Sequence, residues 1–240
     1  MKKFVKILGV LLLVTALLVG VFFVYVSDYY RPDTESIEAF LPGKDVEEKV
    51  LDNGSIAYVP SEYTVGVVFY PGGKVDHLAY EPLMRALAER GILAVLVKMP
   101  YNLAVLKQNA ADGITEQFKG VEKWYMAGHS LGGSMAASYL AKNTDRFDGI
   151  ILLAAYSTAD LKDSGAKVLS VYGSLDGVMN REKYAQYITN LPSDTYEQVI
   201  EGGNHAGFGM YGEQKGDGRA EITNAEQIDL TADIISDFVK

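Results

Sequence analysis

The chain has 240 residues, of which 48% are apolar, a formal net charge of −9 and no cysteine. This length and composition suit one globular domain, or one domain with an appendage, and supply enough apolar residues for a substantial core. The negative charge argues against a nucleic-acid partner, and the lack of cysteine excludes disulfides, thiolate catalysis and zinc–thiolate sites.

The N-terminal segment is apolar behind a basic end. Lys2, Lys3 and Lys6 precede residues 7–26, which carry no charge and are numerous enough to span a bilayer as a helix. The residues at the C-terminal end of this apolar segment lack a small-x-small cleavage pattern and include tyrosines suited to the membrane interface. A lipoprotein anchor would need a cysteine, and the chain has none. We expect a transmembrane signal-anchor over residues 1–26, with a cleaved signal peptide and a secreted domain as the alternative. The lysines would stay inside, so the rest of the chain would face outward at the cell membrane.

Residues 27–45 are polar, contain two prolines, and are expected to form a tether or a first short helix. The folded domain should then cover residues 46–240. It should open with an antiparallel hairpin, because residues 46–51 and 55–59 flank Asp52-Asn53-Gly54, a strong turn signal.

Buried strands and helices alternate through the rest of the domain. Apolar runs predict strands over residues 65–70, 92–97, 124–127, 149–154 and 167–172, and residues 195–200 are expected to form the last strand. Helices are expected over residues 80–90, 102–109, 134–142 and 181–190, with a last helix opened by a capping box at residues 223–226 and running to about 239. This alternation predicts a three-layer α/β domain whose sheet is mostly parallel, with antiparallel strands at its N-terminal end.

A Gly-x-Ser-x-Gly sequence at residues 128–132 lies between an expected strand and an expected helix. In that context it is typical of a nucleophile elbow, a sharp turn that raises a serine hydroxyl above the edge of the sheet. Glycines at 128 and 132 let the strand and the helix approach closely. We therefore predict Ser130 as a nucleophile.

A serine nucleophile needs a base, and an acid that orients the base. The chain has three histidines. His205 follows the last expected strand, at the edge of the sheet where α/β domains open their sites, and is the predicted base. His129 lies beside the serine and is interpreted as a packing residue, while His77 is the alternative base. Asp176 follows the expected strand 167–172 and is the predicted acid.

The oxyanion formed during attack on a carbonyl needs hydrogen-bond donors. We predict the backbone N–H groups of Leu131, directly after the nucleophile, and of Gly73, in the loop after strand 65–70. Lys74, Phe208 and Tyr211 are candidate substrate-binding residues, the last two in a glycine-rich loop after the proposed base. Asp217, which lies between glycines in that loop, hints at a calcium site, but a single carboxylate predicts no metal.

Taken together, these residues resemble the α/β-hydrolase superfamily. The resemblance covers about residues 46–240 and rests on residues 128–133, 173–176 and 203–205. Residues 70–76 and 202–218 are similar to small bacterial hydrolases of the dienelactone-hydrolase and carboxylesterase branches. A dienelactone hydrolase proper carries a cysteine nucleophile, so Ser130 departs from that branch and its substrate is not carried over.

The resemblance implies the α/β-hydrolase fold and hydrolysis of a carboxylic ester, or of a thioester or amide, through an acyl-enzyme without a cofactor. The substrate would be a small molecule or an acyl group of the cell envelope. Only about fourteen residues separate residue 154 from the next strand, so no large lid is expected. An acyltransferase of the same fold and a non-catalytic extracellular binding module are the alternatives, and the oligomeric state is left open.

Overall fold

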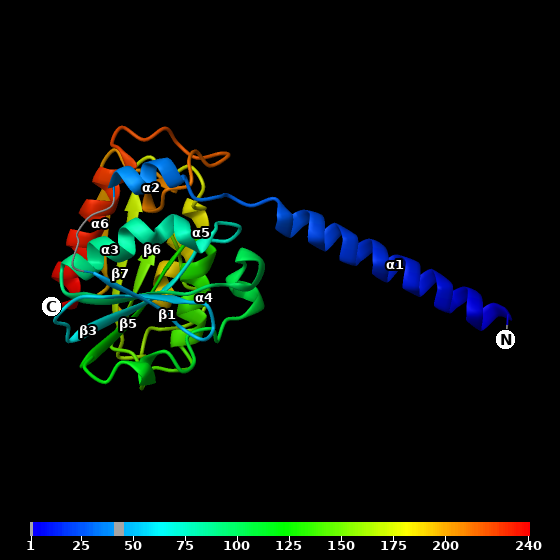
Figure 1. Ribbon diagram of the computed structural model, residues 1–240, viewed down its shortest axis with the longest axis horizontal. Coiled ribbons are helices and arrows are strands. Elements are labelled where there is room, and N and C mark those ends of the chain that lie inside the picture. Colours follow the sequence, from blue (N-terminus) through cyan, green and yellow to red (C-terminus); the bar gives the residue numbers. More distant parts are fainter. Residues whose placement is uncertain (1, 41–45) are drawn as a thin grey trace.

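An eight-stranded sheet with helices on both faces forms the centre of the computed structural model, which describes residues 2–40 and 46–240 (Figure 1). The spatial order of the strands is β1-β2-β4-β3-β5-β6-β7-β8. The first two pairings are antiparallel, and all pairings from β4–β3 to β7–β8 are parallel. The strands are β1 (Glu47–Val50), β2 (Ile56–Val59), β3 (Val65–Tyr70), β4 (Ile92–Leu96), β5 (Lys123–His129), β6 (Gly149–Leu153), β7 (Lys167–Gly173) and β8 (Tyr196–Ile200).

The helices divide between the two faces of the sheet. They are α1 (Lys2–Ser27), α2 (Thr34–Phe40), α3 (Glu81–Glu89), α4 (Leu131–Leu140), α5 (Arg181–Tyr187) and α6 (Asn224–Val239). Apolar residues of α2, α3 and α6 pack on one face, and those of α4 pack on the other. Because side chains alternate along a strand, β3 contributes Val67 and Phe69 to the first core and Val68 and Tyr70 to the second.

The predicted fold class is confirmed. The hairpin of β1 and β2 pairs in the expected antiparallel sense, and the capping box at Thr223 and Glu226 opens α6. Residues 154–166, all of them described, hold no helix or strand, so the connection between β6 and β7 carries no large lid.

The prediction of a helix over residues 102–109 is wrong. The chain makes two short 3-10 turns there, at Pro100–Asn102 and Ala104–Leu106. Tyr101 and Asn102 have positive φ angles of 51° and 56°, which no right-handed helix contains. The Asn102 carbonyl accepts a hydrogen bond from Lys74 N–H instead of continuing a helix.

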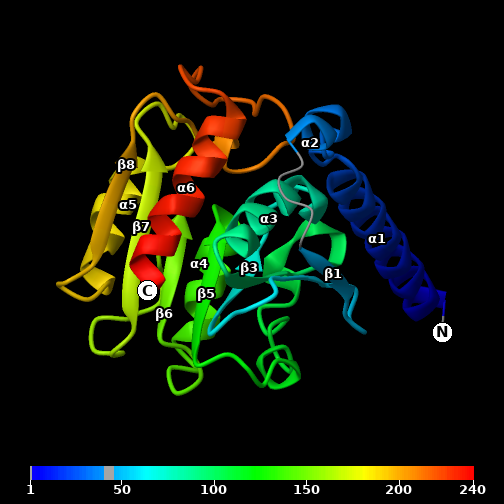
Figure 2. The ribbon, with the colours of Figure 1, turned by 60° about the vertical axis from the view of Figure 1, so that its left-hand side comes forward.

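The N-terminal helix α1 extends away from the domain (Figures 1 and 2). Its segment Lys6–Ser27 is long and apolar enough to cross a membrane by length and composition. The chain then returns to the domain, where Ile37 of α2 is buried in the core. The described part of the expected tether is therefore docked on the domain, while residues 41–45 of it lie outside the described residues.

Candidate active site

The elbow is the turn between β5 and α4. β5 ends at His129 and α4 begins at Leu131, so Ser130 alone makes the turn, with φ 52° and ψ −123°. A Cβ atom on Gly132 would lie 2.2 Å from the Pro71 carbonyl oxygen, and one on Gly128 would lie 2.7 Å from the backbone of Gly132. These positions require glycine because the helix starts directly against β3 and β5. α4 begins three residues earlier than the predicted helix of residues 134–142.

Asp176 and His205 meet in a buried pair. Asp176 follows β7 and His205 follows β8, and the acid Oδ2 lies 2.9 Å from His205 Nδ1. The second oxygen, Oδ1, accepts hydrogen bonds from the backbone N–H groups of Val178 and Met179. The carboxylate is thus fixed by its own loop and in turn orients the imidazole.

Electrostatics favours the ionised form of this acid. Burial alone would raise the pKa of Asp176, but the hydrogen bond and charge of His205 and the two backbone N–H groups outweigh it, so the pKa lies below its ordinary value. An ionised Asp176 accepts a hydrogen bond from His205 Nδ1–H, so in the neutral imidazole Nε2 carries the free lone pair. His205 is therefore held in the tautomer that a general base needs.

Ser130 and His205 open into the same cavity, of about 240 Å³. His205 Nε2 is buried and has no hydrogen-bond partner in the described part of the chain. No hydrogen bond joins it to Ser130 in this structure, and such contacts are often loose when no substrate is bound. The cavity is otherwise lined by Leu131, Ser134, Ala154, Ala155, Tyr156, Val178, Met179 and Asn180.

The two predicted oxyanion donors lie next to each other. A Cβ atom on Gly73 would meet the Leu131 side chain at 2.7 Å, so the loop after β3 passes directly over the start of α4. Leu131 is the first helical residue, and its N–H has no acceptor within the helix. Residues 2–40 and 46–240 offer no hydrogen-bond acceptor to Gly73 N–H either. Both groups are free to bind an oxygen atom.

The fold that places these residues at the carboxyl ends of the strands agrees with comparisons to known proteins. A family model described as the alpha/beta hydrolase family matches residues 66–229. The chain belongs to the α/β hydrolase family. No curated protein matches it.

Solved structures of hydrolases share the fold of this α/β hydrolase. A CIB-like hydrolase from Thermoplasma acidophilum is 18% identical, with a TM-score of 0.56 over 81% of this chain and 100% of that chain. A dienelactone hydrolase from Anabaena variabilis is 15% identical, with a TM-score of 0.60 over 81% and 97%. Est1E from Butyrivibrio proteoclasticus is 15% identical, with a TM-score of 0.55 over 82% and 98%. At these identities the likeness concerns the fold.

His129 lies next to the site, between His205 in the loop after β8 and Tyr80, whose hydroxyl is bonded to the loop after β3. Its ring centroid is 4.5 Å from that of His205, and its Nδ1 is 2.8 Å from the Tyr80 hydroxyl, which also accepts the Gly72 N–H. Burial, together with the charge of His205, holds the pKa of His129 well below its ordinary value. The neutral imidazole and Tyr80 thereby connect the loop of Gly72 to the elbow of this α/β hydrolase.

The candidate substrate-binding residues lie outside the cavity beside Ser130. Phe208 is fully buried against the ring of His129, and Tyr211 is buried against Tyr30 and Tyr80. Lys74 Nζ contacts Asp28 at 2.9 Å and lies over the ring of Tyr25. His77, the alternative base, is buried with its Nδ1 3.1 Å from Asp76.

The sequence analysis missed most of the cavity wall. Tyr156 follows the end of β6, which lies at the same edge of the sheet as Ser130. That position after a strand is the signal from which Tyr156 could have been predicted as a lining residue. Val178, Met179 and Asn180 follow Asp176 in its loop, and nothing in their spacing predicts that the loop folds over Ser130.

Asp217 joins the two loops that carry the acid and the base. Its Oδ1 accepts the N–H groups of Gly177 at 3.0 Å and His205 at 3.2 Å, and its Oδ2 accepts that of Ala206 at 2.8 Å. A carboxylate with this many backbone donors needs no cation. In the described ranges no group of three or more His, Cys, Asp or Glu side chains is arranged to hold a metal ion.

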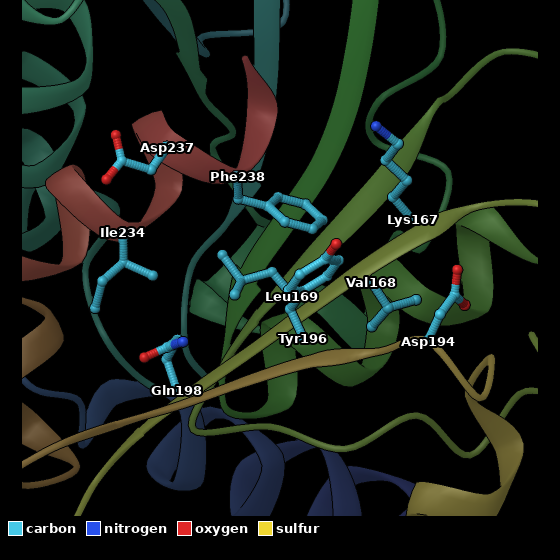
Figure 3. A pocket seen from close by; sticks show the side chains of 9 residues that line it. All are labelled: Lys167, Val168, Leu169, Asp194, Tyr196, Gln198, Ile234, Asp237 and Phe238. Atoms are coloured by element: carbon cyan, nitrogen blue, oxygen red, sulfur yellow. The ribbon is translucent and has the colours of Figure 1, made fainter.

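A larger hollow, of about 480 Å³, lies at the opposite end of the sheet (Figure 3). It is formed by the first half of β7, by β8 and by the end of α6, where the rings of Tyr196 and Phe238 meet edge to face. The lining residues, all labelled in Figure 3, include neither a serine nor a histidine. The smaller cavity beside Ser130 is therefore the candidate active site of this α/β hydrolase.

Proposed function

We propose that the protein is a serine hydrolase of carboxylic esters, with Ser130 as nucleophile, His205 as general base and Asp176 as the group that orients the base. The observation that carries this proposal is His205 itself. Its Nδ1 is held at 2.9 Å by a buried carboxylate, its Nε2 has no hydrogen-bond partner in the described part of the chain, and the residue lines the same cavity as Ser130.

In the proposed reaction, Ser130 Oγ attacks the carbonyl carbon of the ester while its proton moves to His205 Nε2. The carbonyl oxygen becomes an oxyanion that the N–H groups of Leu131 and Gly73 stabilise. When the carbon–oxygen bond to the alcohol breaks, His205 protonates the departing alkoxide, which leaves an acyl-Ser130. Water, deprotonated by His205, then attacks the acyl-enzyme and releases the carboxylic acid.

The cavity favours a short acyl group. Its volume of about 240 Å³ is below the roughly 300–1,000 Å³ typical of sites for drug-sized ligands. Alanine, valine and methionine side chains supply much of its wall. An ester is further supported by the structural likeness to a dienelactone hydrolase, since a lactone is a cyclic ester.

We further propose that residues 1–26 are an uncleaved transmembrane anchor, that 27–45 lead from it, and that the domain of residues 46–240 lies on the outer side of the cell membrane. The length and apolarity of α1 and the lysines confined to its first residues support this arrangement. Protease treatment of intact cells tests it, because an outward domain is digested only when protease is added outside.

A fluorophosphonate probe tests the nucleophile directly. Wild type should be labelled at Ser130, while Ser130→Ala should lose labelling entirely and His205→Ala should lose most of it. A folded wild type that stays unlabelled would contradict the proposal and favour a binding module. A panel of p-nitrophenyl esters of increasing chain length should then show highest kcat/KM for short acyl groups, and added alcohols or amines would reveal acyl transfer among the products.

A further inference from the structure

The chain that leaves α1 lands on the loop of the proposed oxyanion donor. Tyr30 N–H donates to the Lys74 carbonyl at 2.8 Å, and Asp76 N–H donates to the Tyr30 carbonyl at 2.9 Å. Tyr30 and Val75 thus form a short parallel bridge two residues beyond Gly73. The N-terminal helix α1 is therefore connected to the loop that carries Gly73, at the carboxyl end of β3.

This connection sets an upper limit on the distance between the end of α1 and the Gly73 loop. Tyr30 lies four positions after Val26 in the chain. A fully extended chain covers at most about 3.5 Å per position, or about 14 Å in all. The limit depends on chain length alone and so holds for any tilt of α1. If α1 spans a bilayer, the Gly73 loop lies at the membrane surface.

Apolar side chains are exposed at the same place. The ring of Tyr101 lies 5.6 Å from that of Phe22 and 6.1 Å from that of Phe23, both in the last two turns of α1. Tyr101, Val105 and Leu106 are about half exposed, at 51%, 50% and 48%. Lys74 N–H donates to the Asn102 carbonyl, so this segment is joined to the Gly73 loop. In Figure 1, α1 leaves the domain on the side of this connection between β4 and β5.

We propose that the bilayer surface covers Tyr101, Val105 and Leu106, and that the substrates are amphiphilic esters resident in that membrane. This inference rests on the proposed serine hydrolase function and narrows its substrate class. Tyrosine is a preferred residue at the membrane interface, and contact with Phe22 and Phe23 places Tyr101 at that depth. An amphiphile confined to the same surface meets the site at a raised local concentration, and its ester group reaches Ser130 without leaving the bilayer.

Two esters with the same acyl group and with nitrophenolate leaving groups test the substrate class. One is p-nitrophenyl butyrate, which is soluble, and the other carries a hexadecyl chain on the ring and stays in the vesicle. The full chain is reconstituted in phosphatidylcholine vesicles. The variant V105E/L106E should lose about tenfold in kcat/KM for the vesicle-bound ester, the factor that about 1.4 kcal/mol of lost contact produces. It should stay within about twofold of wild type on the soluble ester.

The control is L230E, which introduces a charge at a residue 46% exposed on α6, a helix remote from α1 in Figures 1 and 2. It should leave both activities unchanged. If V105E/L106E lost kcat/KM equally on the two esters, or on neither, the proposal that the substrate resides in the membrane would be overturned.

Measuring how deeply a fluorophore on the protein enters the bilayer tests the docking independently of enzymatic activity. Because the chain has no cysteine, V105C and L230C each give one labelling site for an environment-sensitive fluorophore. Lipids with a spin label near the headgroup should quench the fluorophore at position 105 and leave the one at 230 unaffected. A label at 105 that stays in water, or whose shielding depends on protein density and not on spin-labelled lipid, would overturn the docking. The second result would indicate that another copy of the chain covers this surface.

The two proposals fail in different ways. Turnover of neither ester, together with no fluorophosphonate labelling, would overturn the serine hydrolase and with it the substrate class, while quenching at 105 would still support the membrane-facing surface. Turnover of the soluble ester by wild type, with an unquenched label at 105, would leave the hydrolase standing and overturn this inference.

Discussion

Single residues hold this site together through backbone contacts as much as through side-chain chemistry. Ser130, Asp176 and His205 could be proposed from the sequence because each lies within a few residues after the end of an expected strand. Asp217 was visible only as a carboxylate between glycines. Its partners belong to the loops after β7 and β8, which are adjacent only because of the strand order of the sheet.

Replacing Asp217 by Asn should lower kcat on a p-nitrophenyl ester by about tenfold or more, equivalent to at least about 1.4 kcal/mol of transition-state stabilisation. The amide turns one acceptor oxygen into a donor that faces backbone N–H groups, and hydrogen bonds to a charged group contribute about 1.5–3 kcal/mol each. The exposed Asp163→Asn is the matched control and should keep wild-type kcat. Equal activity of the two variants would show that Asp217 does not position the acid and base loops.

His129 should make the fold sensitive to acid. Its pKa in the folded protein lies well below the ordinary value of 6.5, so well above pH 6.5 the folded and unfolded chains are both neutral at this residue. As the pH falls below 6.5 the unfolded chain takes up a proton that the folded chain refuses, and the free energy of unfolding decreases, by up to about 1.4 kcal/mol per pH unit.

Denaturant unfolding of wild type and His129→Gln at pH 7.5, 6.5 and 5.5 measures this contribution. The stability difference between the two proteins should shift in favour of the variant as the pH falls, and the shift should be larger from pH 6.5 to 5.5 than from pH 7.5 to 6.5. A difference that is constant over the whole range would show that His129 is not buried in its neutral form.

At the scale of elements, the strands follow closely from the sequence and the connections do not. β3 begins and ends where the apolar run does, since glycines, prolines and polar residues bound it. Residues 102–109 resemble a helix locally, yet the left-handed conformation of Tyr101 and Asn102 is accompanied by a hydrogen bond from Lys74, in the loop after β3. Local periodicity contains no information about that partner.

The start of α4 should tolerate no side chain at 132. In Gly132→Ala the new Cβ meets the carbonyl oxygens of Pro71 at 2.2 Å and Tyr70 at 2.3 Å, which are backbone atoms at the end of β3 and directly after it. Overpacking of this kind costs about 1–3 kcal/mol, so Tm should fall by several degrees, about 2–4 °C per kcal/mol for a chain of this size. Ester hydrolysis should fall with it, because the elbow moves.

Gly120→Ala is the matched control for that variant. The nearest atoms to its Cβ would all belong to Tyr63, at 3.5 Å or more, which is ordinary van der Waals contact, and its backbone does not have a positive φ. Tm and kcat should both match wild type, as measured by thermal unfolding and by the ester assay. A Gly132→Ala protein that behaves like the control would contradict the tight packing of α4 on β3.

At the scale of the whole molecule, α1 should decide where the protein resides. Two lysines in its centre, L13K/L17K, should release the protein from the membrane fraction on alkaline washing, because each charged residue opposes insertion by about 2.5–3.5 kcal/mol. V199K/L230K adds the same charge to exposed positions of the domain and should remain with the membranes. Wild type in the soluble fraction would contradict the anchor.

The backbone of Ser130 has a consequence for the stability of the whole fold. A non-glycine residue at φ 52° and ψ −123° is strained, typically by about 1–3 kcal/mol, a sizeable share of the roughly 5–15 kcal/mol that keeps a domain folded. Ser130→Ala retains this strain, while Ser130→Gly relieves it. Both variants should be inactive, yet the glycine variant should unfold about 2–4 °C higher than the alanine variant, a net gain of about 1 kcal/mol after the extra chain entropy of glycine. Stability and reactivity therefore oppose each other at this position: the fold would be more stable with a residue that cannot act as a nucleophile.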